Sequence, residues 1–165
     1  MRGQLSIEFI IVLSGLLLIV ATISMPMYNS ARADAEKISK LADVREAANT
    51  LVNATNTVYA AGVGSKQTIE YWLPQGVVSV SFVSGTENRL DVRIELNLES
   101  DNLIQTSTIL PSETYAGENY VVVSGSILTS PNFRVHHRTT LSYSYDASYA
   151  QPRRIVLLDE IIESV

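Results

Sequence analysis

The chain contains no cysteine and only two histidines, His136 and His137. The absence of cysteine excludes disulfide scaffolds, zinc–thiolate sites and thiol nucleophiles, so the fold must hold without covalent cross-links. Adjacent side chains of a strand point to opposite faces, so the two histidines are not expected to bind one metal ion together. The sequence therefore predicts no metal site and no cofactor.

Basic runs are also missing, and the formal net charge at pH 7 is -5. A nucleic-acid-binding surface needs a basic field that this chain does not supply. Gly62 and Gly64 are not followed by the Lys-Ser/Thr pair of a phosphate-binding loop. No local signature of a catalytic triad occurs either. We therefore expect neither an enzyme nor a partner of nucleic acid.

Charge is absent from residues 9–31, a stretch of 23 residues whose first half is almost wholly aliphatic. As a helix rising about 1.5 Å per residue, this stretch is long enough to cross a hydrocarbon layer about 30 Å thick. Its apolar side chains favour insertion by roughly 3 to 7 kcal/mol, whereas one acidic residue at the helix centre costs about 2.5 to 3.5 kcal/mol. Glu8 lies only at the edge of the stretch. We expect this segment to enter a membrane.

Three interpretations of the apolar segment compete. It resembles a secretory signal peptide in having Arg2 before it and a small-x-small sequence at residues 31–33, although that site lies well beyond the dense apolar run. It also fits an ordinary single-pass anchor, but that interpretation gives Glu8 no purpose. The third interpretation assigns Glu8 a role, because an ionisable residue beside a membrane helix usually has a partner.

The first nine residues carry a motif that supports the third interpretation. A short basic leader ends at Gly3, and Gln4, Ser6 and Glu8 then follow in the pattern Q-x-S-x-E directly before the apolar run. This stretch resembles the processing region of archaeal type IV pilins with class III signal peptides. The resemblance implies that a prepilin peptidase removes residues 1–3 by cutting between Gly3 and Gln4. It also implies that the apolar segment stays on the mature protein.

The resemblance further implies how Glu8 would act. Cleavage creates a cationic amine on Gln4, and a carboxylate in a low-dielectric helix bundle needs a positive partner. Removing one member of such a pair leaves a costly orphan charge, so the pair of Gln4 and Glu8 would fix filament register. The implied partners are copies of the chain, a pilus assembly ATPase and a membrane platform protein. The precursor would sit in the cell membrane with its head outside, and the assembled subunit in an extracellular pilus.

A helical pattern continues beyond the apolar segment. Apolar or small residues recur at spacings of three and four through residues 41–58, which indicates an amphipathic helix. Gly62 and Gly64 are a credible helix stop. A helix over residues 4–61 would be about 87 Å long, and a head of about 100 residues, with a radius of gyration near 13 Å, could not cover it. Pro26 should kink or loosen this helix.

Residues 65–165 change to a period of two and predict a β-rich extracellular head. Asp91, Arg93, Glu95 and Asn97 alternate with apolar residues as in a half-buried strand. Residues 154–162 fit either a strand or a short helix. The predicted fold class is α+β, with a long N-terminal helix and an antiparallel β-sandwich-like head, the lollipop shape that the pilin resemblance implies. We expect strands at residues 69–73, 78–82, 91–98, 103–110, 120–128, 133–145 and 154–162.

Few head residues suggest a site. His137 shares a strand face with apolar residues and is expected to be a satisfied semi-buried histidine, whereas His136 lies in a basic stripe with Arg134 and Arg138. The tyrosines of the C-terminal half fit either an adhesion surface or ordinary strand composition: Tyr115, Tyr120, Tyr143, Tyr145 and Tyr149. Asn53 begins the one glycosylation sequon and is a candidate modification site if its helix face is exposed.

Two functions follow from these patterns. The first is a structural subunit of a pilus-like surface filament that assembles through its N-terminal helix, with adhesion as a candidate role, as either a major or a minor pilin. The alternative is a monomeric, membrane-anchored cell-surface protein with a β-sandwich binding module.

Overall fold

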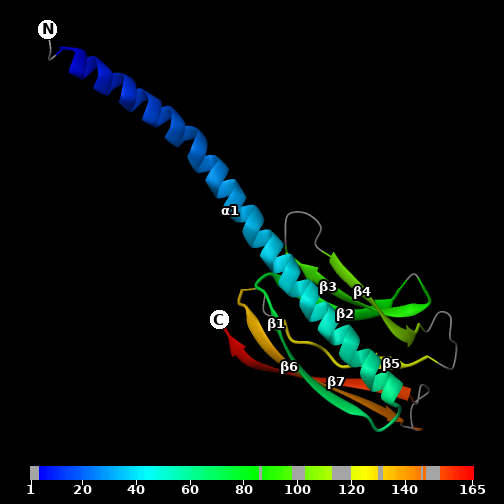
Figure 1. The fold of residues 1–165 in the computed structure, drawn as a ribbon. Helices are drawn as coiled ribbons and strands as arrows, with labels where there is room; N and C mark the ends of the chain where they lie inside the picture. The colour runs from blue at the N-terminus through cyan, green and yellow to red at the C-terminus, as the bar shows by residue number, and fades with distance from the viewer. Residues whose placement is uncertain are drawn as a thin grey trace. The chain divides into compact units, whose positions relative to one another are not determined.

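A computed structural model gives the α+β fold that the sequence predicts, with one long helix followed by two β-sheets (Figure 1). The chain divides into two compact units, with the boundary between Ser39 and Lys40. The structure describes residues 4–85, 87–97, 103–112, 120–129, 132–145, 147 and 153–165.

Helix α1 spans Gln4–Ala61 and continues through Pro26 without a break. It ends at the predicted glycine stop, where Gly62 and Gly64 take positive φ angles of 87° and 95° that favour glycine. The Ser65 hydroxyl donates a 2.7 Å hydrogen bond to the carbonyl of Val58 and so satisfies one orphan group of the last turn.

Seven strands follow in the described part of the chain and form two sheets. The four-stranded sheet has the order β1-β6-β7-β5, and the three-stranded sheet has the order β2-β3-β4. Adjacent strands pair antiparallel, as the sequence predicts, except for the parallel pair of β5 and β7. The strands are β1 (Lys66–Leu73), β2 (Val77–Ser84), β3 (Arg89–Leu96), β4 (Leu103–Pro111), β5 (Val122–Ser124), β6 (Val135–Tyr145) and β7 (Arg153–Ser164).

Two of the sequence predictions needed the structure to decide them. Residues 154–162 are confirmed as strand, because they lie in β7 and pair along almost the whole of β6. The strand predicted at residues 120–128 is reduced to the three residues of β5, since Gly125 takes a φ of 124° and ends the extended run.

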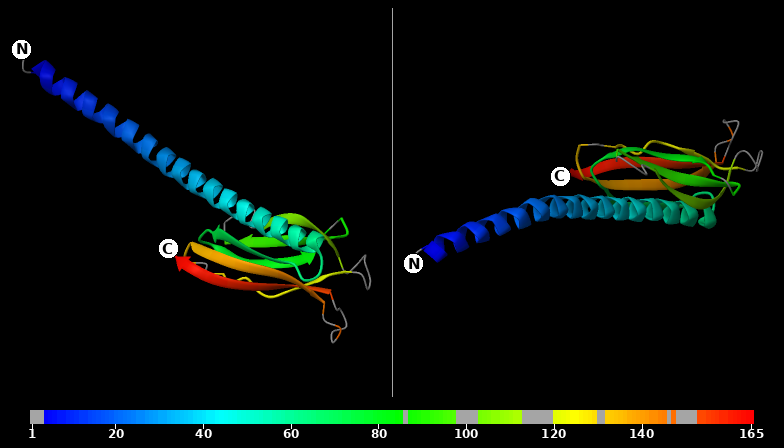
Figure 2. Two further views of the ribbon diagram at one scale, coloured as in Figure 1. Left: turned by 60° about the horizontal axis from the view of Figure 1, so that its bottom comes forward. Right: turned by 90° about the horizontal axis from the view of Figure 1, so that it is seen from above.

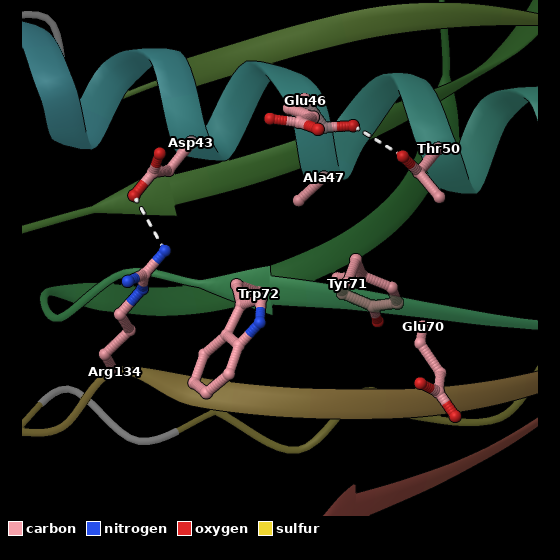
Figure 3. Close-up of a pocket in the computed structure, with 8 residues that line it drawn as sticks. All are labelled: Asp43, Glu46, Ala47, Thr50, Glu70, Tyr71, Trp72 and Arg134. Atoms are coloured by element: carbon pink, nitrogen blue, oxygen red, sulfur yellow. Dashed lines mark hydrogen bonds and ion pairs between the residues drawn. The ribbon is translucent and has the colours of Figure 1, made fainter. Parts of the chain in front are cut away.

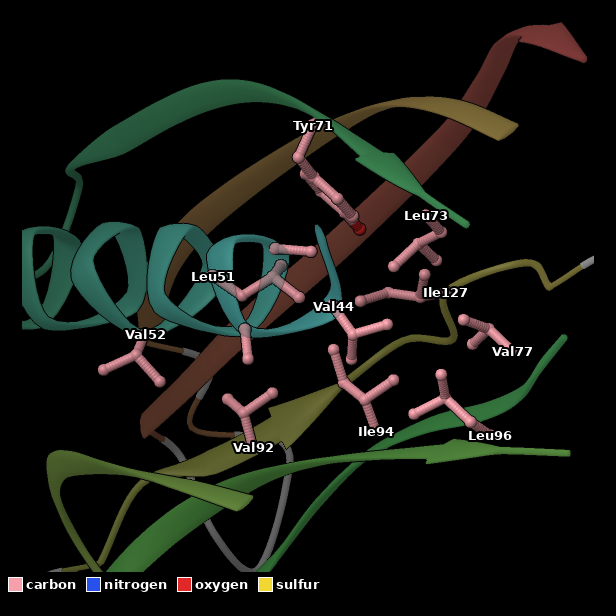
Figure 4. Close-up of a cluster of buried hydrophobic side chains, with 12 residues drawn as sticks. Val44, Leu51, Val52, Tyr71, Leu73, Val77, Val92, Ile94, Leu96 and Ile127 are labelled. Atoms are coloured by element: carbon pink, nitrogen blue, oxygen red, sulfur yellow. The ribbon is translucent and has the colours of Figure 1, made fainter. Parts of the chain in front are cut away.

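The final turns of α1, from Lys40 onward, pack against both sheets (Figure 2). Leu51 is fully buried, and Figure 4 shows it among side chains from β1, β3 and the segment near Ile127. A large apolar side chain contributes roughly 1.5 to 3 kcal/mol when it is fully buried. This part of the helix is therefore an element of the head's core. The buried helix residues are Val44, Ala47, Ala48, Leu51, Val52, Ala54, Thr55 and Val58.

Strand β3 departs from the predicted alternation at Asp91. The pattern placed this residue on a solvated face, but only 2% of it is exposed. Its carboxylate accepts a hydrogen bond from the side-chain amide of Gln105. The turn after β2 also lies against it, because a Cβ added to Gly85 would collide with the Asp91 carboxylate. The turn after β2 and the neighbouring strand β4 therefore bury Asp91, which the local alternation predicted to be exposed to solvent.

Candidate functional site: the apolar helix segment

The first part of α1 presents apolar side chains in every direction. Phe9, Val12 and Ile19 are each more than 60% exposed. The helix is long and apolar enough to cross a membrane, although length and composition alone also fit a signal sequence. A helix that is apolar all round needs lipid or other chains to bury it.

Two hydroxyl side chains in the middle of this segment are paired within the helix. The hydroxyls of Ser14 and Thr22 donate 2.7 Å hydrogen bonds to the carbonyls of Ile10 and Leu18, four residues earlier. A hydroxyl in hydrocarbon is costly without a partner, and the helix backbone supplies that partner here. These two hydroxyls can therefore face an apolar environment without losing a hydrogen bond.

The predicted processing motif lies at the start of α1. Gly3 is outside the described residues, and Gln4 and Ser6 are described only as helical backbone. Glu8 is helical and exposed. Cleavage at Gly3 and the pairing of Gln4 with Glu8 remain predictions.

Asn53 and the threonine of its sequon differ in accessibility. The Asn53 side chain is exposed, whereas Thr55 is fully buried and donates a 2.7 Å hydrogen bond to the carbonyl of Leu51. A glycan on Asn53 would project into solvent, but the folded helix hides the threonine hydroxyl of the sequon. Glycosylation at this site therefore remains a prediction.

His137 belongs to a buried polar cluster that the sequence did not predict. Its Nδ1 lies 2.9 Å from Oδ2 of Asp159 on β7, and Thr139 donates a 2.5 Å hydrogen bond to the other carboxylate oxygen. The backbone N–H of Leu128 donates a third bond to Asp159, at 3.0 Å. The Tyr71 ring stacks on the imidazole with centroids 5.4 Å apart. The prediction of a satisfied semi-buried histidine is corrected in two respects, because His137 is fully buried and its Nε2 has no hydrogen-bond partner among the described residues.

The pKa values of this cluster follow from burial and hydrogen bonding. Burial by itself would raise the pKa of Asp159, but the hydrogen bonds from His137 and Thr139 outweigh it and hold that pKa below its ordinary value. Burial raises the pKa of the Tyr71 hydroxyl, which lies 3.0 Å from the Thr139 hydroxyl. The cluster therefore favours an ionised aspartate and a neutral tyrosine.

The basic stripe on the opposite face of β6 is not a free cationic surface. Arg138 lies 2.9 Å from Glu70, and Arg134 lies 3.6 Å from Asp43. His136 stacks on Trp72 with ring centroids 4.5 Å apart. Each arginine of the predicted stripe therefore lies beside a carboxylate, Asp43 of α1 or Glu70 of β1, and His136 is covered by the ring of Trp72.

A cavity of about 180 Å³ lies beside this group, between β1 and the part of α1 within the head (Figure 3). Carboxylates of Asp43, Glu46 and Glu70 contribute to its wall together with Arg134. Among the described residues, no cluster of three or more histidine, aspartate or glutamate side chains could hold a metal ion.

The tyrosines of the C-terminal half that the structure describes do not share one environment. Tyr143 is buried and its ring lies 5.9 Å from that of Tyr59, whereas Tyr145 is 58% exposed. Tyr120 is partly buried, and Tyr115 and Tyr149 lie outside the described residues.

Comparison of the chain with protein-family models, curated proteins and solved structures finds no match.

Proposed function

We propose that this chain is a pilin-like structural subunit that is inserted in the membrane and then assembles into a surface filament through the apolar part of α1. The observation that carries the proposal is the all-round exposure of apolar side chains at residues 9–28. Such a surface must be covered either by lipid or by other apolar helices. Lipid covers it in the membrane, and the helices of neighbouring subunits cover it in a filament core. Gly15 leaves room for a neighbouring helix to approach closely, because it has no side chain and nothing lies within 4 Å of the position where a Cβ would be.

The processing motif supplies the finer part of the proposal. A prepilin peptidase cuts between Gly3 and Gln4 on the cytoplasmic side, and the new amine of Gln4 pairs with Glu8 within or between subunits. An assembly ATPase and a platform protein then act on the membrane-embedded subunit. The head faces the outside of the cell, and the polar helix face between residues 32 and 46 carries charges of both signs that suit a solvated environment.

The mass of the native N-terminus tests this proposal first. A mature chain that begins at Gln4 supports it. A chain that retains Met1 or Arg2 supports the monomeric membrane anchor instead, and a chain that begins at Asp34 shows that the apolar segment is a cleaved secretory signal.

The role of Glu8 is tested by filament assembly. Glu8→Ala is expected to insert in the membrane yet to abolish filaments seen by electron microscopy of the cell surface, whereas Asp34→Ala, an exposed acidic residue of the same helix, should leave them intact. Normal filaments from Glu8→Ala would remove the proposed role of this carboxylate. Cells without the gene provide the background image.

A further inference from the structure

The three-stranded sheet has an unusual distribution of charge. Its central strand, β3, carries Arg89, Asp91, Arg93 and Glu95, whereas both edge strands, β2 and β4, contain no charged residue. Edge strands of soluble domains commonly carry charges that prevent pairing with other chains. Strand β1, an edge of the other sheet, follows that rule with Lys66 and Glu70. Strand β5, the other edge of that sheet, is also uncharged but is only three residues long. Among the described strands, the long uncharged edges are therefore β2 and β4, of eight and nine residues.

Each uncharged edge is blocked at one end by a side chain of the described part of the molecule. The Thr129 hydroxyl donates a 3.0 Å hydrogen bond to the carbonyl of Val78, near a register shift at the start of β2. The Asn56 side chain accepts a 2.8 Å bond from the N–H of Ile109, near the end of β4 at Pro111. No described strand pairs with the outer edge of residues 80–84 or of residues 103–107.

The two open lengths match in position and direction. Val83 pairs with Asp91, and Asp91 pairs with Ser107, so the open lengths lie at one level across the sheet. Both β2 and β4 run antiparallel to β3 and therefore run in the same direction as each other. A second copy displaced sideways in the same orientation would bring its β4 beside the β2 of the first.

The open part of β2 also borders an uncharged groove. Two adjoining cavities of about 310 and 260 Å³ lie between β2 and β5, and both are lined by Phe82 and Val123. None of the lining residues is charged. The helix residues nearest to β4 are uncharged too, since α1 has no charged residue from 47 to 61 and contacts β4 through Asn56. Among the described residues, the Arg93 guanidinium reaches β4 only as a donor to the side chain of Gln105. The described residues from β5 and α1 that border the two open lengths are therefore uncharged on both sides.

From these observations we infer that heads associate edge to edge, with residues 103–107 of β4 in one copy pairing in parallel with residues 80–84 of β2 in a second copy. Backbone hydrogen bonds supply this contact, as in other cases of strand addition to an open edge. The contact joins two different surfaces, so it can propagate along a row of subunits instead of closing into a dimer. It involves the heads alone and does not depend on the helix bundle proposed above.

Cross-linking of the full-length chain in detergent micelles and in lipid vesicles tests the contact. The chain has no cysteine, so Val83→Cys and Ser107→Cys introduce the only thiols when differently tagged chains are mixed and oxidised. A disulfide requires Cα atoms about 4.4 to 6.8 Å apart, so the mixed pair should give at least about ten times the yield of Val83→Cys mixed with Ser142→Cys. Ser142 lies on the central strand β6 of the other sheet.

The outcomes separate this contact from its rivals. Yields equal to the Ser142 control would overturn the proposal, and a Val83→Cys homodimer as the main product would show self-pairing of β2 instead. Ser81→Lys, which places a charge on the open edge, should reduce the mixed disulfide, whereas Ser144→Lys on β6 should not. Circular dichroism of each variant checks that the head is folded. Because no filament is required, loss of this contact and loss of Glu8-dependent assembly are distinguishable.

Discussion

Nδ1 of His137 and Oδ2 of Asp159 lie 2.9 Å apart, and both side chains are fully buried. An ionised carboxylate can only accept hydrogen bonds, so the imidazole donates through Nδ1. The two residues come from neighbouring strands, β6 and β7, and the pair therefore ties together the centre of the four-stranded sheet.

Asp159→Ala should strongly destabilise the head. The variant leaves His137, Thr139 and the N–H of Leu128 without their acceptor, and removing one partner of a buried pair typically costs about 3 to 5 kcal/mol. Urea unfolding followed by the fluorescence of the single tryptophan, Trp72, measures the loss. Glu160→Ala, at an exposed neighbour, should change the unfolding free energy by no more than about 0.5 kcal/mol. Equal effects of the two substitutions would contradict the importance of the buried pair.

The contribution of Asp159 should disappear in acid. Its pKa is lower in the folded state than in the unfolded state, so its stabilising contribution is complete above the unfolded pKa of about 3.9 and is lost as the pH falls below that value through the folded pKa. The difference in unfolding free energy between the native chain and Asp159→Ala should be constant above about pH 5 and shrink below about pH 4. A difference that is unchanged down to pH 2 would argue against an ionised aspartate.

Leu51→Ala should destabilise the head although Leu51 belongs to the helix. The side chain is fully buried in a cluster with strand residues, and truncation of such a leucine costs about 2 to 5 kcal/mol. Leu158→Ala is the matched control, because that side chain is 63% exposed. The two unfolding curves are compared by Trp72 fluorescence. Similar curves would show that α1 contributes little to the core.

Gly125→Ala should cost more than Gly64→Ala. Both glycines have positive φ angles, of 124° and 95°, so both variants carry backbone strain of about 1 to 3 kcal/mol. Only at Gly125 would the added Cβ also collide with the carbonyl oxygen of Leu157, while nothing lies within 4 Å at Gly64. The difference between the thermal unfolding midpoints of the two variants measures the effect of the collision, because both variants share the backbone strain. A smaller loss for Gly125→Ala would mean that β7 can move aside at this point.

The local periodicity of apolar and polar residues in the sequence determined much of this fold. The uncharged stretch at residues 9–31, the three- and four-residue spacing through residue 58 and the glycines after Ala61 specify a helix because helical contacts are local. The alternation in β3 and β6 likewise specified strands, since side chains of a strand alternate between its two faces. The motif at Gln4, Ser6 and Glu8 suggested a function that the fold alone does not carry.

Only the tertiary structure decided how these elements meet. Strand order, the partnership of His137 with Asp159 and the burial of Asp91 depend on residues distant in sequence or on a covering turn, which a local repeat does not specify. The same holds for the open edges of β2 and β4, because a strand becomes an edge only through its neighbours. Local periodicity sets which elements form, whereas long-range packing sets which of their groups are buried, paired or left open.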